Sequence, residues 1–263
     1  MGAAYINMFT VQELTDAVLA YKPVAAATQK GWSYGIRGFE DKQVADIDKK
    51  FVVMRRVQLN QLGYKQGYVR TLLGYCGTIW TWAKEMDLVD NNPWEGSLKG
   101  LHKGKKAYPF LPFEHYSKLH HEPLFMCMWY HGFRANEIAG IQQDEVVLDA
   151  DIPYFDIKPN TVRGIKNKPS IRKVPIHPAC KQLIKQLPYT DNPKAGDYYS
   201  RHMKKICGHS AHGIRHNITT RMRKAGIEYS IAAAILGHSA SSMTAGYGHI
   251  LLEDMAEQLQ KLR

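Results

Sequence analysis

Apolar side chains recur at helical spacing through the first hundred residues. Over residues 66–86 they fall at intervals of three and four, which predicts an amphipathic helix with one buried face. The run DNNP at 90–93 should end it, because proline cannot continue a helix. Residues 44–62 combine apolar and basic side chains at helical spacing, and residues 1–25 are too short and plain to form a domain alone. We therefore expect a helical N-terminal region.

A basic, glycine-rich stretch separates this region from the rest. Residues 96–106 (GSLKGLHKGKK) offer little to bury, so they are interpreted as an exposed linker, with a surface loop as the alternative. Beyond it, LPFE at 111–114 should open a helix, and the apolar run 122–130 predicts a buried one. The boundary between two well-patterned regions favours two domains.

The pattern changes again between residues 146 and 176. Short β-leaning runs, VVLDADIPYFDI and IRKVPI, flank a turn-like region at 158–170, which predicts a small antiparallel sheet. After Pro178 the spacing is helical to the end. The expected fold is mainly α with a small antiparallel β-sheet, in two domains: residues 1–98 helical, 99–110 a basic linker, and 111–263 an α+β domain.

Composition narrows the class of partner. The chain has 263 residues, of which 44% are hydrophobic, as in a globular protein. Its net charge of +11 and pI of about 9.4 favour a polyanion: DNA, RNA or an anionic membrane. Membrane is the least favoured, since no apolar run approaches the roughly 20 residues of a spanning helix and no signal-peptide layout opens the chain. Four scattered cysteines without a CxxC pair indicate reduced thiols in a cytoplasmic protein.

Two segments in the second domain carry basic residues in suggestive settings. In HGFRANEI (131–138), Arg134 follows an apolar helix and a glycine, so it should be partly buried and need an acceptor. Glu137 lies three residues on and can hold it, and taken alone a structural Arg–Glu pair is the better interpretation. In GIKNK (164–168), Lys166 lies at the expected hairpin tip, where it faces either solvent or a groove.

Two further segments add a histidine–arginine pair and a tyrosine. In HGIRH (212–216), His212 and Arg215 share a helical face, where imidazole can pass a proton and guanidinium can grip phosphate; a polar structural cluster is the alternative. LGHS (236–239) offers Gly237 as a helix C-cap. In TAGYGH (244–249), Tyr247 stands between two glycines, each weakening a helix by roughly 1 kcal/mol. Such a tyrosine suits a nucleophile that swings into a site.

In this order, GFRANEI, the lysine turn before IRKVPIHP, HGIRH, LGHS and TAGYGH resemble the catalytic domain of tyrosine recombinases, the phage-integrase family. The upstream region resembles that family's helical core-binding domain, including Asn92-Pro93 before the linker, and the resemblance covers residues 25–250. It implies a phosphate clamp, a turn lysine that protonates the leaving group, two histidines and a nucleophile, at these positions: Arg134 and Arg215; Lys166, with Lys168 as competitor; His212 and His238; Tyr247.

The resemblance also implies a reaction. Tyr247 forms a covalent 3′-phosphotyrosyl bond and frees a 5′ hydroxyl, so religation needs no ATP, metal or other cofactor. Strand exchange through a Holliday junction follows, with double-stranded DNA bound by a homotetramer and with DNA-bending proteins as candidate accessory partners. We expect a bacterial or phage-encoded, nucleoid-associated cytoplasmic protein without the N-terminal arm-binding domain of many phage integrases. The candidate phosphate contacts outside the catalytic set are Lys99, Lys103, Lys105, Lys106 and Lys168.

Three alternatives stay open at this point. Cys207, His209, His212 and His216 lie close enough in sequence for a zinc site, with an i,i+4 histidine pair. Basic charge and helices also fit a DNA-binding regulator without catalysis, and a type IB topoisomerase shares the chemistry. The C-terminal tail carries an apolar stripe that packs either on its own domain or on a neighbouring protomer, formed by Leu251, Met255, Leu259 and Leu262.

Overall fold

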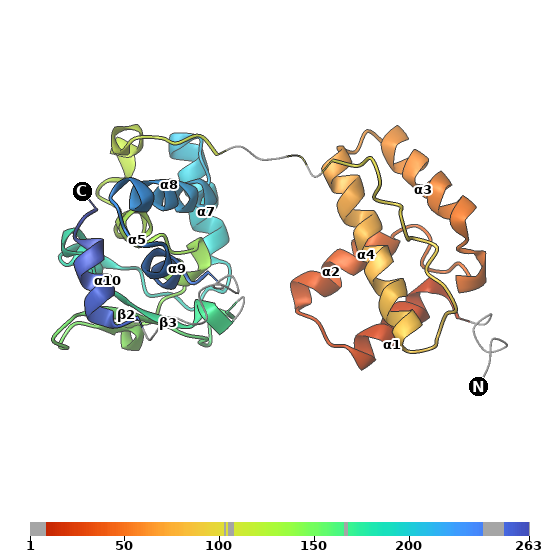
Figure 1. Ribbon diagram of the computed structural model, residues 1–263, viewed down its shortest axis with the longest axis horizontal. Coiled ribbons are helices and arrows are strands. Elements are labelled where there is room, and N and C mark those ends of the chain that lie inside the picture. The colour runs from red at the N-terminus through yellow and green to blue at the C-terminus, as the bar shows by residue number, and fades with distance from the viewer. Residues whose placement is uncertain (1–8, 103, 105–107, 166–167, 239–249, 263) are drawn as a thin grey trace. The chain divides into compact units, whose positions relative to one another are not determined.

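The computed structural model describes residues 9–102, 104, 108–165, 168–238 and 250–262. The chain forms two compact units, Met1–Lys106 and Ala107–Arg263 (Figure 1). In the described residues both units are largely helical, and the second contains a three-stranded antiparallel sheet. The predicted fold class, mainly α with a small antiparallel sheet, is confirmed. Within the same residues, no helix combines the length and apolarity that crossing a membrane requires.

The first unit is built around one long helix. Its helices are α1 (Val11–Tyr21), α2 (Ala26–Ile36), α3 (Lys49–Gln61) and α4 (Gln66–Glu85), with a 3₁₀ turn at Val44–Asp46. The helix α4 packs against the other three (Figure 1), and its length agrees with the predicted helix 66–86. The core is rich in aromatic side chains, including Trp32, Trp80 and Trp94, each no more than 2% exposed.

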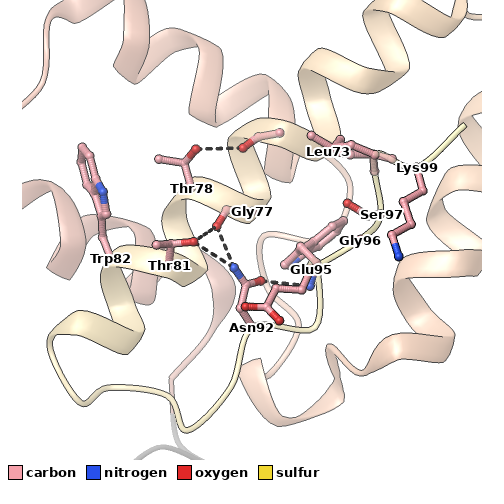
Figure 2. A pocket seen from close by; sticks show the side chains of 13 residues that line it. Leu73, Gly77, Thr78, Thr81, Trp82, Asn92, Glu95, Gly96, Ser97 and Lys99 are labelled. Atoms are coloured by element: carbon pink, nitrogen blue, oxygen red, sulfur yellow. Dashed lines mark hydrogen bonds between the residues drawn. The ribbon is translucent and has the colours of Figure 1, made fainter. Parts of the chain in front are cut away.

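A single asparagine ties the segment after α4 back onto that helix. The side-chain amide of Asn92 donates to the Gly77 carbonyl at 2.9 Å and to Thr81 Oγ1 at 3.0 Å, while its Oδ1 accepts from Trp94 N at 2.9 Å (Figure 2). This segment and α4 line a pocket of about 510 Å³. The helix itself ends earlier, at Glu85. The DNNP run therefore does not stop the helix; through Asn92 it attaches the segment that follows α4 to that helix.

The first unit continues past residue 98, where sequence analysis ended it. Leu101 is 5% exposed. Arg56 Nη1 donates to the Lys99 carbonyl at 2.9 Å, and Arg70 Nη1 donates to the carbonyls of Leu98 and Leu101 at 3.1 and 3.2 Å. The backbone of residues 96–101 is therefore held against the first unit, with Ser97 and Leu101 buried and Lys99 exposed. In the sequence, Leu98 and Leu101 stand among glycines and lysines, so they form no recognisable apolar pattern. The arginines that bond this backbone come from helices distant in the chain.

The second unit combines its helices with a small sheet that lies at one edge of the unit (Figure 1). The opening expected at 111–114 is a 3₁₀ helix, Phe113–Leu119, and the apolar run forms the buried helix α5 (Pro123–His131). The remaining elements are α6 (Ala135–Ala139), β1 (Val146–Val147), β2 (Tyr154–Ile157), β3 (Arg172–Pro175), α7 (Ala195–Cys207), α8 (Ala211–Lys224), α9 (Tyr229–Leu236) and α10 (Leu252–Leu259), with short 3₁₀ turns between them.

The strands pair in the order β1-β2-β3, all antiparallel. Phe155 is the centre of this register, opposite Val146 on β1 and Val174 on β3. Phe155 and Ile157 point into the core and are fully buried, which reflects the period-two alternation of a half-buried strand. The connection from β2 to β3 is longer than a tight turn and contains buried Arg163, which forms two 2.9 Å hydrogen bonds with Glu145.

The C-terminal tail packs on its own unit in this structure. The helix α10 lies against β3 and α9, with Met255, Leu259 and Leu262 buried and Leu251 exposed. His177 Nε2 also hydrogen-bonds the Leu262 carbonyl at 3.1 Å.

Candidate active site

Two arginines and a histidine from distant segments line one pocket in the second unit. Arg134 is the N-cap residue of α6, whereas His212 and Arg215 lie in the first turns of α8. All three line a pocket of about 380 Å³, together with Gly164 and Ile165, the residues just before Lys166. Their place in the sequence, about eighty residues apart, makes the convergence a product of the fold.

The carboxylate of Glu137 is the common partner of three guanidinium groups. It bonds Arg134 Nη1 through Oε1, lies 3.1 Å from Arg172 Nη2 and 3.9 Å from Arg215 Nη1 through Oε2, and is 5% exposed. Burial by itself would raise the pKa of this carboxyl, but Arg172 and Arg134 bring it below its ordinary value. Glu137 is therefore ionised at neutral pH. The Arg134–Glu137 pair predicted from the sequence is present.

Arg215 is held from both sides by backbone carbonyls. Its Nη1 donates to the Gly132 carbonyl and its Nη2 to the Leu236 carbonyl, and its side chain is 7% exposed. Burial, followed by repulsion from Arg134, lowers its pKa to about 10, so it remains cationic at neutral pH. Gly132 must be glycine here: its φ is +67°, and a Cβ would collide with Ile218 and Leu236.

Arg172 on β3 is a member of this cluster that sequence reasoning missed. Its Nε donates to the Ile235 carbonyl and its Nη1 to the Ser170 carbonyl, both at 2.8 Å, while Nη2 contacts Glu137. Ser170 Oγ in turn accepts from Arg134 Nη1 at 2.9 Å. In the sequence Arg172 is one charged residue in a strand-like run, and only tertiary contacts distinguish it from Lys173.

His212 contacts a second histidine that sequence reasoning considered only as a zinc ligand. Its Nε2 lies 3.2 Å from Nε2 of His216, one turn further along α8. The ring of Tyr108 stacks on His216 with centroids 4.4 Å apart and meets the edge of His212 at 5.3 Å. Where the two rings hydrogen-bond, the Nε2 of one donates and the Nε2 of the other accepts.

His238 lies beside the cluster but faces a neighbouring pocket. It follows Gly237, the left-handed C-cap of α9, whose carbonyl accepts from Arg134 Nη2 at 3.4 Å. Partial burial, followed by the charges of Arg215 and Arg134, lowers the pKa of His238. Its side chain nevertheless lines a pocket of about 280 Å³ between α8 and α9, not the one that holds His212.

The other predicted positions divide into two groups. Lys168 is exposed in the 3₁₀ turn Lys168–Ser170, and Lys99 is exposed on the first unit. The remaining residues lie outside the described part of the chain: Lys103, Lys105, Lys106, Lys166 and Tyr247. Their roles stay predictions.

The four-residue zinc site does not assemble. In the described residues no group of three or more His, Cys, Asp or Glu side chains is placed to hold a metal ion. Cys207 Sγ instead donates to the Met203 carbonyl at 3.1 Å, and the His209 ring packs against His115 at 5.1 Å. Only the His212–His216 contact remains of that alternative.

The chain has the fold of the tyrosine recombinases that act as integrases. It is similar to the Tn1549 transposon integrase in complex with circular intermediate DNA, with a TM-score of 0.68, 15% identity, and coverage of 95% of this chain and 99% of that one. It is also similar to a lambda integrase dimer bound to a COC′ core site, with a TM-score of 0.66, 16% identity, and coverage of 94% of this chain and 82% of that one. For a lambda integrase tetramer bound to a Holliday junction, the TM-score is 0.65 and the identity 14%, with coverage of 94% of this chain and 81% of that one. No protein-family model and no curated protein matches the sequence.

Proposed function

We propose that this protein is a site-specific DNA recombinase that cuts and rejoins DNA strands through a covalent bond between Tyr247 and a 3′ phosphate. The observation that carries the proposal is the convergence of Arg134, Arg215 and His212 in one pocket, within a chain that has the integrase fold. The family resemblance and the shared pocket lining both support these three residues. Three guanidinium groups, those of Arg134, Arg172 and Arg215, surround the single carboxylate of Glu137, so this cluster carries the net positive charge that a phosphodiester site requires.

The arginines neutralise the non-bridging phosphate oxygens as negative charge grows in the transition state. They are not equivalent. The Arg134 side chain is 26% exposed, whereas that of Arg215 is 7% exposed. The phosphate therefore meets Arg134 first. The two carbonyl bonds of Arg215 use two of its five N–H donors, so it can contact a phosphate oxygen while it stays bonded to the backbone. Glu137 keeps both groups oriented before DNA arrives.

Two proton transfers complete the reaction. A tyrosine hydroxyl has an ordinary pKa near 10, so Tyr247 needs a base, and His212 is the imidazole that lines the arginine pocket. Lys166 protonates the leaving 5′ oxygen, with Lys168 as the competing residue. His238 donates a further hydrogen bond to the phosphate after turning from its neighbouring pocket. The tyrosyl ester retains the energy of the broken bond, so rejoining requires no further energy source.

The proposal extends to the assembly. The DNA complexes of the Tn1549 and lambda integrases support double-stranded DNA as the partner, and the lambda dimer and tetramer support a homotetramer that exchanges strands through a Holliday junction. The first unit would bind the core site, and Lys99, Lys103, Lys105 and Lys106 would contact phosphates.

A nicked suicide substrate tests the covalent step. A nick near the cleavage point releases a short fragment that cannot religate, so the protein stays attached and migrates as a covalent adduct on a denaturing gel. We expect the adduct with the wild-type protein and none with Tyr247→Phe, which should still bind DNA. Wild-type protein that binds but never forms an adduct would support a regulator. Supercoil relaxation without recombinant product would support a topoisomerase.

A further inference from the structure

The two histidines of α8 bring their Nε2 nitrogens close together. His212 and His216 are separated by one helical turn, and their Nε2 atoms are 3.2 Å apart. Tyr108 packs on both rings, in parallel with His216 and edge-on to His212. The aromatic contact restricts the rotation of both imidazoles, so the facing arrangement is prepared in advance.

This spacing matches a metal chelate. Zn²⁺ binds histidine nitrogen at about 2.0–2.1 Å, and two such bonds at a tetrahedral angle place their nitrogens roughly 3.3 Å apart. The measured 3.2 Å agrees with that value. Imidazole is a ligand for zinc, nickel, cobalt and copper, whereas magnesium prefers oxygen ligands. The pair therefore discriminates between classes of divalent ion.

We propose that His212 and His216 form a two-imidazole site for divalent transition-metal ions, with water filling the remaining positions. The pocket beside His212 gives that water room, since Asp197 and Ser200 also line it. A bound ion occupies the lone pair of His212 Nε2, which His212 needs in order to accept a proton. On the proposed function, which this consequence requires, the ion blocks strand cleavage reversibly.

The charges around the pair limit how tightly it binds. Arg134, Arg172 and Arg215 surround Glu137 and repel a cation, and the carboxylates of Glu137 and Asp197 offset only part of their charge. Two protein ligands also hold an ion less firmly than the three or four of a resident zinc site. The site is thus expected to fill and empty with the free-ion concentration, and not to carry a permanent cofactor.

Metal binding can be measured without any reaction. Isothermal titration of the full-length protein with ZnCl₂, and the visible spectrum of added Co²⁺, should show one ion per chain, with no response to Mg²⁺. His216→Gln should weaken zinc binding by about 100-fold, because loss of even an outer-sphere partner costs about 10–100-fold in metal affinity. His209→Gln is the matched control: it is a nearby histidine outside the pair and should leave the affinity unchanged.

The cleavage arm uses the same proteins on the suicide substrate. Zinc should suppress adduct formation by the wild type, a chelator should restore it, and His216→Gln should cleave in zinc as it does in chelator. Thermal unfolding verifies that this variant is folded, and Tyr108→Leu, which leaves both ligands, should weaken zinc binding by a smaller factor.

The possible results separate the two proposals. Absence of zinc binding by the wild type, or equal binding by His216→Gln, would overturn the metal site. Zinc inhibition that persists unchanged in His216→Gln would overturn its link to cleavage. Zinc binding through the pair in a protein that forms no DNA adduct would leave the site standing and remove the recombinase function.

Discussion

At the scale of single residues, one carboxylate organises the candidate site. Glu137 contacts Arg134, Arg172 and Arg215, which belong to three different elements. A buried charge cluster of this kind contributes little net stability when complete, but removing one member leaves the others uncompensated. Arg172 shows this most clearly, because its side chain is only 7% exposed and it bonds Glu137 and the carbonyls of Ile235 and Ser170.

Replacing Arg172 with methionine should therefore destabilise the second unit. The change removes the buried donor of the Ile235 carbonyl and one of the cations that compensate Glu137, and we expect a loss of about 3–5 kcal/mol in the free energy of unfolding. Urea denaturation followed by circular dichroism measures it. Lys173→Met is the neighbouring control on β3, where the side chain is exposed and the effect should stay below 1 kcal/mol, roughly the worth of surface charges. Equal losses in the two variants would contradict the buried network.

Arg134 and Arg215 should matter for chemistry far more than for binding. Replacing either with alanine removes a positive group that acts mainly on the transition state, and we expect cleavage to slow by about 10²–10³-fold or more. The suicide-substrate rate measures cleavage, and a gel shift measures affinity. Arg223→Ala, an exposed position on α8, is the control. Parallel losses in rate and affinity would mean that the two arginines only hold DNA.

His131 should make stability depend on pH. It is fully buried, accepts from His177 N at Nε2 and contacts the Cys127 carbonyl through Nδ1, both at 2.9 Å, so the neutral ring is satisfied on both sides. Burial lowers its pKa to about 3, against an ordinary value of 6.5. Between these values the unfolded chain binds the extra proton, so stability rises with pH and is lost as pH falls.

The expected size is about 2 kcal/mol less stability at pH 5 than at pH 8 from this group alone. Urea midpoints across that range measure it. His131→Gln should lower stability throughout but flatten the slope, with the remainder from His177, whose pKa burial also lowers. His121→Gln, an exposed control, should keep the full slope. An unchanged slope in His131→Gln would show that the buried ring is not the source.

At the scale of elements, Gly237 connects the end of α9 with the arginine cluster. Its φ is +63°, and a Cβ there would lie 2.9 Å from Arg172 Nη1. Gly226 is a matched position, with φ of +69° and nothing within 4 Å of a Cβ. Left-handed backbone costs an L-residue about 1–2 kcal/mol at either site.

Gly237→Ala should thus cost more than Gly226→Ala, by about 1–3 kcal/mol for displacing Arg172. Thermal unfolding of the two variants measures the difference directly. On the proposed function, only Gly237→Ala should also slow adduct formation, since Arg134 bonds the Gly237 carbonyl. If the two variants unfold alike, the close approach of Arg172 carries no energetic weight.

Elements with strong local periodicity could be predicted from the sequence. The helix expected at 66–86 is α4. The apolar run 122–130 forms α5 together with its N-cap, Glu122, and the β-leaning runs contain the paired strands. His212 and Arg215 share a helical face as their spacing predicts, whereas Arg134 joins them through the fold, as the family resemblance implied. Arg172 and residues 96–101 could not be found in this way, because their partners are distant in the chain and leave no periodic trace.

At the scale of the whole molecule, affinity for DNA should fall steeply with salt. A protein that neutralises phosphates releases counterions, which gives a log–log slope of about −0.9 for each phosphate contacted. Fluorescence anisotropy with labelled duplex at several salt concentrations measures the slope. Lys99→Ala should reduce it by about one unit, and a flat response would exclude a surface that follows the phosphate backbone.

The net charge of +11 is an unreliable guide to that slope. The guanidinium groups of Arg56 and Arg70 donate hydrogen bonds to carbonyls of residues 97–101. Arg163 forms an ion pair with Glu145 in the interior. Such groups hold parts of the polypeptide together and are not expected to release counterions when DNA binds. The number of ions released should accordingly be smaller than a count of basic residues suggests, and neutralising these inward-facing arginines should loosen the fold before it loosens the grip on nucleic acid.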